Sequence, residues 1–218
     1  MRNSVTYQYI KDPQQIEQES FKQIRELTDL DGLSTEQQQV VMRIVHSVGI
    51  PSIAKQVRFS EQACENALRA LASESCAILC DVEMVKQGLT KRMLRSEPLC
   101  FLNDPHITER AKALGETRTM AAVEGWKAKL DGSIILIGNA PTALFRLLEI
   151  LQTTEVRPAL IVGMPVGFIG AAESKQALWD AHRELGVECI TLLGREGGSA
   201  VTAATFNALL RCLNGELY

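Results

Sequence analysis

The sequence predicts an α/β protein: a three-layer domain with a mostly parallel sheet flanked by helices and preceded by an N-terminal helical segment. Helical periodicity dominates the first third of the 218 residues. From residue 76 onward, short apolar runs without polar alternation suit strands that are buried on both faces. Helical stretches separate these runs, which is the pattern of βα units. Because no internal repeat, low-complexity tract or linker is present, we expect residues 1–218 to form one domain.

Three helices are expected in the first third of the chain. The Asp-Pro pair at residues 12–13 provides an N-cap and a first-turn proline, and the Asp-Gly pair at 31–32 ends that helix. Residues 34–37 have the form of a capping box and open a second helix that runs towards Gly49. A third helix is expected over residues 60–71.

Five apolar runs are predicted to be strands, and longer segments between them to be crossover helices. The predicted strands are residues 76–81, 99–103, 133–138, 159–164 and 188–194. The predicted crossover helices include residues 118–130, 142–151 and 172–185. In a parallel sheet of this kind, ligands gather at the carboxyl ends of the strands.

Composition and net charge narrow the class of protein. With 46% hydrophobic and 22% charged residues, the chain is typical of a soluble globular protein. The net charge of -3 argues against a general nucleic-acid binder, although a few arginines in one cleft can still bind an anion. The N-terminal residues contain no apolar signal core, and no apolar segment is long enough to span a bilayer. We therefore expect a cytoplasmic protein.

The six cysteines lie mostly within apolar runs and form no C-x-x-C pair. Structural zinc sites usually show close pairs of cysteine or histidine ligands. The sequence therefore predicts reduced, buried thiols and no metal site.

Three glycine-rich turns follow predicted strands and lead into helices. They are IGNAPTAL (137–144), GMPVGFIGAAESK (163–175) and GREGGSAVTAA (194–204). Backbone amides at such turns, next to helix N-termini, bind phosphates or carboxylates. Glycine at one of these turns is ordinary turn chemistry, but three turns on one edge favour an anion-binding rim. None matches the Walker loop or the G-x-G-x-x-G fingerprint, so nucleotide binding has little support.

His46 lies in the segment RIVHSVG of the second predicted helix. At about 100° of rotation per residue, the apolar residues of this helix fall within one arc, which we expect to be buried: Val40, Val41, Ile44, Val45 and Val48. His46 lies nearly opposite the centre of that arc, and Arg43 shares the polar side. His46 is therefore expected to face solvent or a cleft rather than the core.

Other polar residues are weaker candidates for chemistry. His106 is expected at the surface in the first turn of a helix, and His182 lies in the charged run DAHRE, which is typical of a solvated helix face. Lys175 can form a Schiff base only if it is buried, and an exposed lysine or one that pairs with a carboxylate is commoner. Asp81 and Glu83 follow a predicted strand and are interpreted as ligand-edge or capping groups.

Six blocks of the sequence occur in an unusual combination: RIVHSVG, ILCDVEMVKQG, ETRTMAA, GNAPTALFRLLE, GMPVGFIGAAESK and GREGGSAVTAA. Together they resemble the precorrin-8X methylmutase (cobalt-precorrin-8 methylmutase) family of cobalamin biosynthesis. The resemblance runs over nearly the whole chain. It is highly specific because IGNAPTALF and PVGFIGAAESK are long and unusual.

The resemblance implies a homodimeric α/β isomerase whose site lies at the subunit interface and which needs no separate cofactor. Such an enzyme moves a methyl group between adjacent carbons of ring C in a corrinoid (tetrapyrrole) precursor, giving hydrogenobyrinic acid or its cobalt counterpart, cobyrinic acid. The catalytic histidine of the family falls on His46, in the matching R-x-x-H context. There it would protonate the macrocycle or hydrogen-bond to it.

The implied substrate is a large apolar ring with acetate and propionate arms, which needs a broad cleft with a few placed polar groups. Arg43 and Arg118 are the best candidates to bind the arms, because a guanidinium can grip a carboxylate bidentately. Ser20, in the EQESF stretch that matches the N-terminal segment of the family, is a candidate hydrogen-bonding contact.

Further arms would meet the glycine-rich rims through backbone amides around Asn139, Gly167 and Gly198. Arg195 is also a candidate for binding an arm. This chain has Glu196 where the family more often carries a second basic residue, which puts a direct role for that position in doubt.

Two alternatives stay open from the sequence. A corrinoid-binding or carrier protein would hold the product without turnover. A nucleotide-binding α/β protein would need a phosphate-gripping lysine loop, which the sequence lacks. The sequence also leaves open whether the natural substrate carries cobalt.

Overall fold

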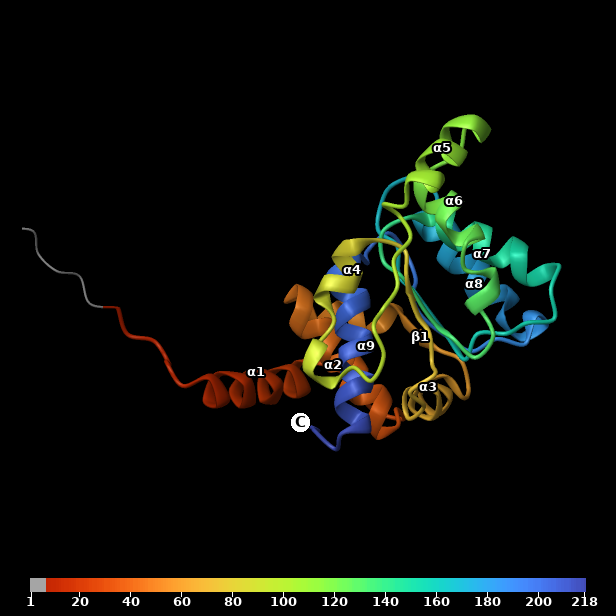
Figure 1. The fold of residues 1–218 in the computed structure, drawn as a ribbon. Coiled ribbons are helices and arrows are strands. Elements are labelled where there is room, and N and C mark those ends of the chain that lie inside the picture. The colour runs from red at the N-terminus through yellow and green to blue at the C-terminus, as the bar shows by residue number, and fades with distance from the viewer. Residues whose placement is uncertain (1–6) are drawn as a thin grey trace, which may run out of the picture.

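The computed structural model describes residues 7–218 and has the expected α/β architecture, with a sheet between two layers of helices (Figure 1). Residues 1–6, which belong to the predicted 1–218 domain, lie outside the described residues. This arrangement confirms the fold class predicted from the apolar runs.

Among residues 7–218 the sheet has five strands in the order β1-β5-β4-β3-β2. Strands β2 to β5 are parallel, and β1 pairs antiparallel with β5 at one edge. Their bounds are Val57–Phe59 (β1), Ile78–Cys80 (β2), Ile134–Ile137 (β3), Leu160–Gly163 (β4) and Cys189–Leu192 (β5). The carboxyl ends of the four parallel strands therefore lie along one edge of the sheet.

Successive strand residues pack in different cores, which explains why the strands show no polar alternation. Ile134 and Leu136 of β3 lie in one hydrophobic cluster, and Ile135 and Ile137 lie in the other. Each such side chain contributes about 1.5–3 kcal/mol when it is fully buried. The sheet is thus apolar and covered on both faces.

Helices form the two outer layers (Figure 1). One layer contains α2 (Thr35–Val48), α3 (Ala63–Leu71), α4 (Glu83–Gly88) and α9 (Ser199–Leu213), with α1 (Pro13–Leu27) packed on α2. The other contains α6 (Arg118–Glu124), α7 (Pro141–Gln152) and α8 (Ala171–Leu185), with α5 (Pro105–Leu114) packed on α6. Short 3-10 helices are η1 (Pro51–Gln56), η2 (Lys91–Met93) and η3 (Lys127–Lys129). Within residues 7–218, no helix combines the length and the apolar character needed to cross a membrane.

The N-terminal caps predicted for the first two helices are confirmed, as is the end predicted for the second. The first helix ends at Leu27, before the Asp-Gly pair at residues 31–32 that was predicted to end it. Asp12 accepts a hydrogen bond from the amide of Gln15 at 2.7 Å. Ser34 and Gln37 form both hydrogen bonds of the capping box. Gly49 ends α2 in the left-handed region, with φ of 71°, where glycine carries no Cβ penalty.

The strand predicted at residues 99–103 is wrong. Only Leu99 forms a bridge, with Leu79 of β2. The chain turns directly afterwards, and Asp104 caps α5 by accepting from the amide of His106 at 2.9 Å. Leu99 and Phe101 pack against the second core, so the apolar run serves burial rather than strand pairing.

Two further elements differ from expectation. Strand β1 carries Arg58 at its centre and has only three residues, so it gave no apolar run to detect. The helix expected over residues 118–130 ends at Glu124 as α6, because Gly125 is a poor helix former, and η3 follows.

All six cysteines are free in the structure. Cys64, Cys76, Cys80 and Cys189 are buried, whereas Cys100 and Cys212 are half-buried. Burial raises the pKa of the Cys64 thiol to about 12, so this thiol is protonated at neutral pH. Within residues 7–218, no group of three or more His, Cys, Asp or Glu side chains could hold a metal ion.

Candidate active site

His46 lies on the outer side of α2, as helix geometry predicted. Val40, Val41, Ile44 and Val45 are buried, and Val48 packs at the margin of the core. His46 itself is exposed. It is therefore available to a ligand and contributes little to the core.

The imidazole of His46 is stacked rather than free in solvent. Its ring lies 5.1 Å from the ring of Phe21 on α1, with 20° between the planes. Partial burial lowers the pKa of His46 below the ordinary value for histidine, and the nearby positive charge of Arg43 lowers that pKa further. At neutral pH the imidazole is mainly uncharged, with one nitrogen as donor and the other as acceptor.

Arg43 is held between α1 and the end of the chain. Its Nη2 donates to Glu17 at 2.8 Å and to the hydroxyl of Tyr218 at 2.6 Å. The guanidinium carbon lies 4.5 Å from the ring centre of Phe21 and 4.6 Å from that of Tyr218. The Nε atom of Arg43 is buried without a hydrogen-bond partner among residues 7–218, so the guanidinium keeps unused donor capacity.

Glu17 carries the negative charge of this cluster. Burial acts to raise the pKa of Glu17, but hydrogen bonds from Tyr218 and Arg43 outweigh it and hold the pKa below its ordinary value. Glu17 and Phe21 are one helical turn apart on α1, so they reach the same face of α2. Neither of these two residues, nor Tyr218, was predicted from the sequence to belong to the site.

Ser20 lies beside this cluster on α1. It is half-buried, and its hydroxyl donates to the main-chain oxygen of Ile16 at 2.7 Å. Its oxygen can still accept a hydrogen bond from a ligand. Ser20, Arg43 and His46, three of the predicted site residues, therefore lie on the face shared by α1 and α2.

Arg118 and Asn139 lie together at the ends of β2 and β3. Both are exposed and line a cavity of about 410 Å³, whose wall consists of Val82, Leu102, Thr117, Arg118, Thr119, Asn139, Ala140, Pro141 and Thr142. The structure thus brings these two predicted residues into one cavity.

Asp81 holds the turn that carries Asn139. Its carboxylate accepts from the amides of Gly138 at 3.1 Å, Asn139 at 2.8 Å and Ala140 at 3.0 Å. Burial raises the pKa of Asp81 even though these amides favour the carboxylate. Because these amides already donate to Asp81, Asn139 would contact a ligand through its side chain. Asp81 is a capping group, one of the interpretations made from the sequence.

Gly167, Arg195 and Gly198 lie in the turns after β4 and β5, which are tied together. The amide of Gly198 donates to the main-chain oxygen of Met164 at 2.8 Å, and that of Gly167 to the oxygen of Arg195 at 3.3 Å. Arg195 is exposed, with its guanidinium carbon 5.8 Å from the ring centre of Phe168. The approach is so close that a Cβ on Gly197 would lie 2.3 Å from the oxygen of Met164.

The expectations for Lys175 and His182 are wrong. Lys175 is fully buried, its ammonium donates to the main-chain oxygen of Glu196 at 2.5 Å, and burial lowers its pKa to about 8. His182 is only 7% exposed and stacks on Trp179 at 4.8 Å. Both share the buried stripe of α8 with Leu178. The i, i+3, i+7 spacing of 175, 178 and 182 would have revealed this. His106 is exposed, as predicted.

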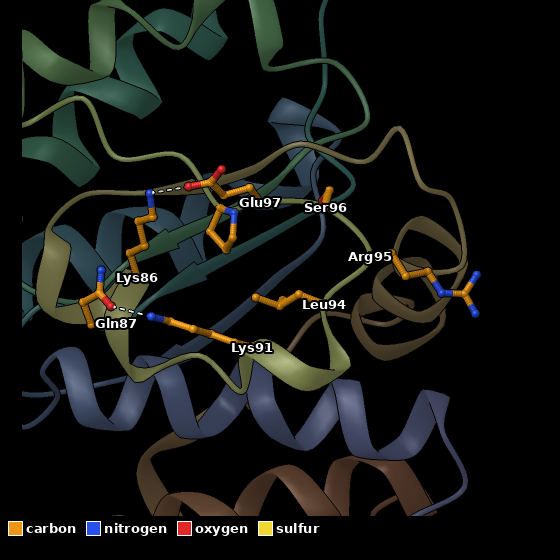
Figure 2. Close-up of a pocket in the computed structure, with 8 residues that line it drawn as sticks. Lys86, Gln87, Lys91, Leu94, Arg95, Ser96 and Glu97 are labelled. Atoms are coloured by element: carbon orange, nitrogen blue, oxygen red, sulfur yellow. Dashed lines mark hydrogen bonds and ion pairs between the residues drawn. The ribbon is translucent and has the colours of Figure 1, made fainter.

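A further cavity, of about 460 Å³, lies between α4 and residues 94–98 (Figure 2). Lys86 pairs with Glu97 at 3.2 Å across this cavity, and Lys91 donates to Gln87 at 2.9 Å. None of the predicted site residues lines it.

The predicted site residues thus form separate groups in one chain. Helices α1 and α2 lie at one end of the molecule, and α5 and α6 at the other (Figure 1). Within residues 7–218, no hydrogen bond or ion pair joins Ser20, Arg43 or His46 to the other predicted residues.

Comparison with known proteins covers nearly the whole chain. Residues 15–212 match the protein-family model described as precorrin-8X methylmutase. The chain is 43% identical to the precorrin-8X methylmutase of Pseudomonas aeruginosa, over 92% of this chain and 96% of that protein. It is 36% identical to the cobalt-precorrin-8 methylmutase of Priestia megaterium, over 90% and 87% of the two chains.

A solved structure shows the same fold. The precorrin-8X methylmutase of Thermus thermophilus superposes with a TM-score of 0.83 at 37% identity, covering 94% of this chain and 98% of that one. The fold, the family match and the curated relatives agree: this chain belongs to the precorrin-8X methylmutase family.

Proposed function

We propose that the chain is a single-domain methyl-migrating isomerase of corrin synthesis in which His46 is the catalytic acid–base residue. The substrate is precorrin-8 or its cobalt form, and the product is hydrogenobyrinic or cobyrinic acid. Membership of a family whose relatives carry both substrate names supports this reaction. The observation that supports the role of His46 is its exposed imidazole, stacked on Phe21 and close to Arg43.

The reaction moves one methyl group between neighbouring carbons of ring C, so no group enters or leaves the molecule. A proton donated to the macrocycle, or a hydrogen bond to it, lowers the barrier by withdrawing electron density from the ring system. An imidazole with a pKa somewhat below its ordinary value can do either at neutral pH. In this proposal His46 supplies the proton or the hydrogen bond, and no separate cofactor has to supply it.

The carboxylate arms would be bound by the three cationic side chains at the predicted positions. Arg118 and Arg195 are exposed, whereas Arg43 is half-buried and would bind an arm through the accessible part of its guanidinium. Ser20 and Asn139 supply polar contacts, and the turns around Gly167 and Gly198 shape the rim. Val166, Phe168 and Ile169 are exposed on the same rim and provide an apolar surface suited to a macrocycle.

We further propose that two copies of the chain complete the site. One chain alone places His46 and Arg118 in separate groups, and a second copy could bring its own Arg118 to His46. Helix α1 projects from the body (Figure 1). Ile10 just before it, and Ile16 and Leu27 on it, are exposed. Exposed apolar side chains of this kind are typical of an interface. Reduced thiols and a biosynthetic role support a cytoplasmic location.

The deciding experiment compares wild-type protein with His46→Ala on metal-free and cobalt-bearing precorrin-8. We expect the wild type to convert at least one substrate, as seen in the absorption spectrum, and His46→Ala to lose about 10²–10⁴ in rate while still binding the product. The exposed His106→Ala is the control and should keep its rate. A wild type that binds the product but converts neither substrate would instead identify a carrier protein.

A further inference from the structure

Tyr218 lies at the centre of the contacts around His46 and Arg43. Its ring stacks on Phe21, with 4.0 Å between the ring centres and 12° between the planes. Phe21 is only 3% exposed and also stacks on His46. The three rings of Tyr218, Phe21 and His46 therefore form one connected stack, built from the end of the chain, α1 and α2.

The main chain of Tyr218 is fixed by two neighbouring helices. The side chain of Gln39, which is buried on α2, donates to the main-chain oxygen of Tyr218 at 2.8 Å and accepts from its amide at 3.1 Å. Arg25 of α1 donates to the same oxygen at 2.7 Å. These bonds tie the position of Tyr218 to the packing of α1 on α2.

The hydroxyl of Tyr218 accepts hydrogen bonds from two cations. Arg43 donates at 2.6 Å and Arg211 of α9 donates at 2.7 Å. The hydroxyl in turn donates to Glu17, which also receives Arg43 at 2.8 Å and lies 3.7 Å from Arg211. Two guanidinium groups that would repel each other are thus held side by side by one hydroxyl and one carboxylate.

We propose that Tyr218 is a positioning residue for the reaction: it orients the imidazole of His46 through the ring of Phe21 and fixes the guanidinium of Arg43 through its hydroxyl. This inference rests on the proposed function of His46. Two separable routes lead from Tyr218 to the site. The ring route acts on the catalytic step, and the hydroxyl route acts on substrate binding.

Two substitutions separate these routes. Tyr218→Phe keeps the stack and removes the hydroxyl, so we expect KM for the precorrin substrate to rise several-fold with little change in kcat. Tyr218→Ala also removes the ring, which frees Phe21 and His46, and we expect kcat to fall by about 10- to 100-fold. Leu217→Ala, at the exposed neighbouring residue, is the matched control and should leave both constants unchanged.

A second measurement does not depend on turnover. The imidazole proton of His46 is titrated by NMR in the free protein and identified by its absence in His46→Gln. Loss of the Tyr218 ring lets water reach the stack, so the pKa of His46 should rise towards its ordinary value in Tyr218→Ala and stay nearly unchanged in Leu217→Ala. A structural role confined to folding would not shift this titration in a folded variant.

Folding is checked by circular dichroism and thermal unfolding. If Tyr218→Ala does not fold, Tyr218→Leu takes its place, because leucine fills space without an aromatic face. Unchanged kcat and an unchanged His46 titration in a folded variant without the ring would overturn the proposal. If the wild type converts neither form of precorrin-8, the proposed function fails, while the NMR titration still decides the positioning by Tyr218.

Discussion

His46 is exposed, yet its ring stacks on that of Phe21 and lies within the electrostatic influence of Arg43. Phe21 removes water from the stacked side of the ring, and Arg43 adds positive charge nearby. Both effects disfavour the imidazolium, so the pKa of His46 lies below its ordinary value. A residue can thus be accessible to a large substrate and still have its protonation state set by the protein.

The charge of Arg43 can be tested directly through His46. Arg43→Gln removes a positive charge that disfavours the imidazolium, so we expect the pKa of His46 to rise. The same upward shift should appear in the pH dependence of kcat/KM if His46 is the acid–base residue. Arg58→Gln on β1 serves as control, because Arg58 donates to the main-chain oxygens of Lys55 and Val57 and is not among the charges that shift the pKa of His46. An unchanged His46 titration in Arg43→Gln would show that burial alone sets the pKa.

At the scale of elements, the turns after the parallel strands are held by interactions within the protein. The turn after β3 is held by Asp81, and the turns after β4 and β5 hold each other through main-chain hydrogen bonds. Several amides that glycine-rich turns could offer to an anion are therefore already in use. The binding capacity of this rim therefore lies mainly in its side chains.

Asp81 should be important for stability. The two oxygens of Asp81 together accept three main-chain amides, and in Asp81→Asn an NH₂ group replaces one of them. At least one amide then loses its acceptor, so we expect a loss of about 1–3 kcal/mol in the free energy of unfolding. Urea denaturation measures this loss. Asp104→Asn is the matched control, since Asp104 is an exposed N-cap and asparagine caps equally well. Equal stability of the two variants would contradict this role of Asp81.

Substitution of Gly197 tests how closely the turns after β4 and β5 approach each other. A Cβ there would lie 2.3 Å from the oxygen of Met164, in addition to the strain of a φ of 152°. We expect Gly197→Ala to lower Tm more than Gly132→Ala, which has a φ of 63° but open space around its Cβ. Thermal unfolding of both variants separates the clash from the backbone strain. A similar fall in Tm for both would mean that the turns can move apart.

At the scale of the whole molecule, the fold separates the residues that one substrate would have to contact. Helices α1 and α2 carry Ser20, Arg43 and His46. Arg118 begins α6, and Asn139 and Arg195 lie in the turns after β3 and β5. Helices α1 and α6 lie at different ends of the molecule (Figure 1). Two copies related by a twofold axis would give two equivalent sites, each with residues from both chains.

Mixing two inactive variants tests such a shared site. His46→Ala and Arg118→Ala chains, unfolded together and refolded in equal amounts, would form mixed dimers with one intact site of two. We expect about a quarter of the wild-type rate from the mixture, because half of the dimers are mixed. Each variant refolded alone is the control. A mixture no more active than its parts, from a protein that sediments as a dimer, would place both residues in the same chain's site.

The sequence predicted much of this arrangement. The apolar runs indicated the α/β class, the caps placed α1 and α2, and the 3.6-residue period placed His46 away from the core, because these features depend on neighbours within a few residues. The same period, applied to α8, would have shown that Lys175 and His182 are buried. The run at 99–103 was misassigned because apolar character serves burial in a loop as well as in a strand.

Only the tertiary structure decided what surrounds His46. The contact between Tyr218 and Arg43 joins residues 175 positions apart, and that between Tyr218 and Gln39 joins residues 179 apart. Such contacts depend on how the end of α9 packs against α2 and α1, and no local pattern encodes this. In the same way, only the folded sheet shows that Asp81 occupies the amides after β3. The sequence determined which side chains are available, and the packing of distant segments decided which of them meet.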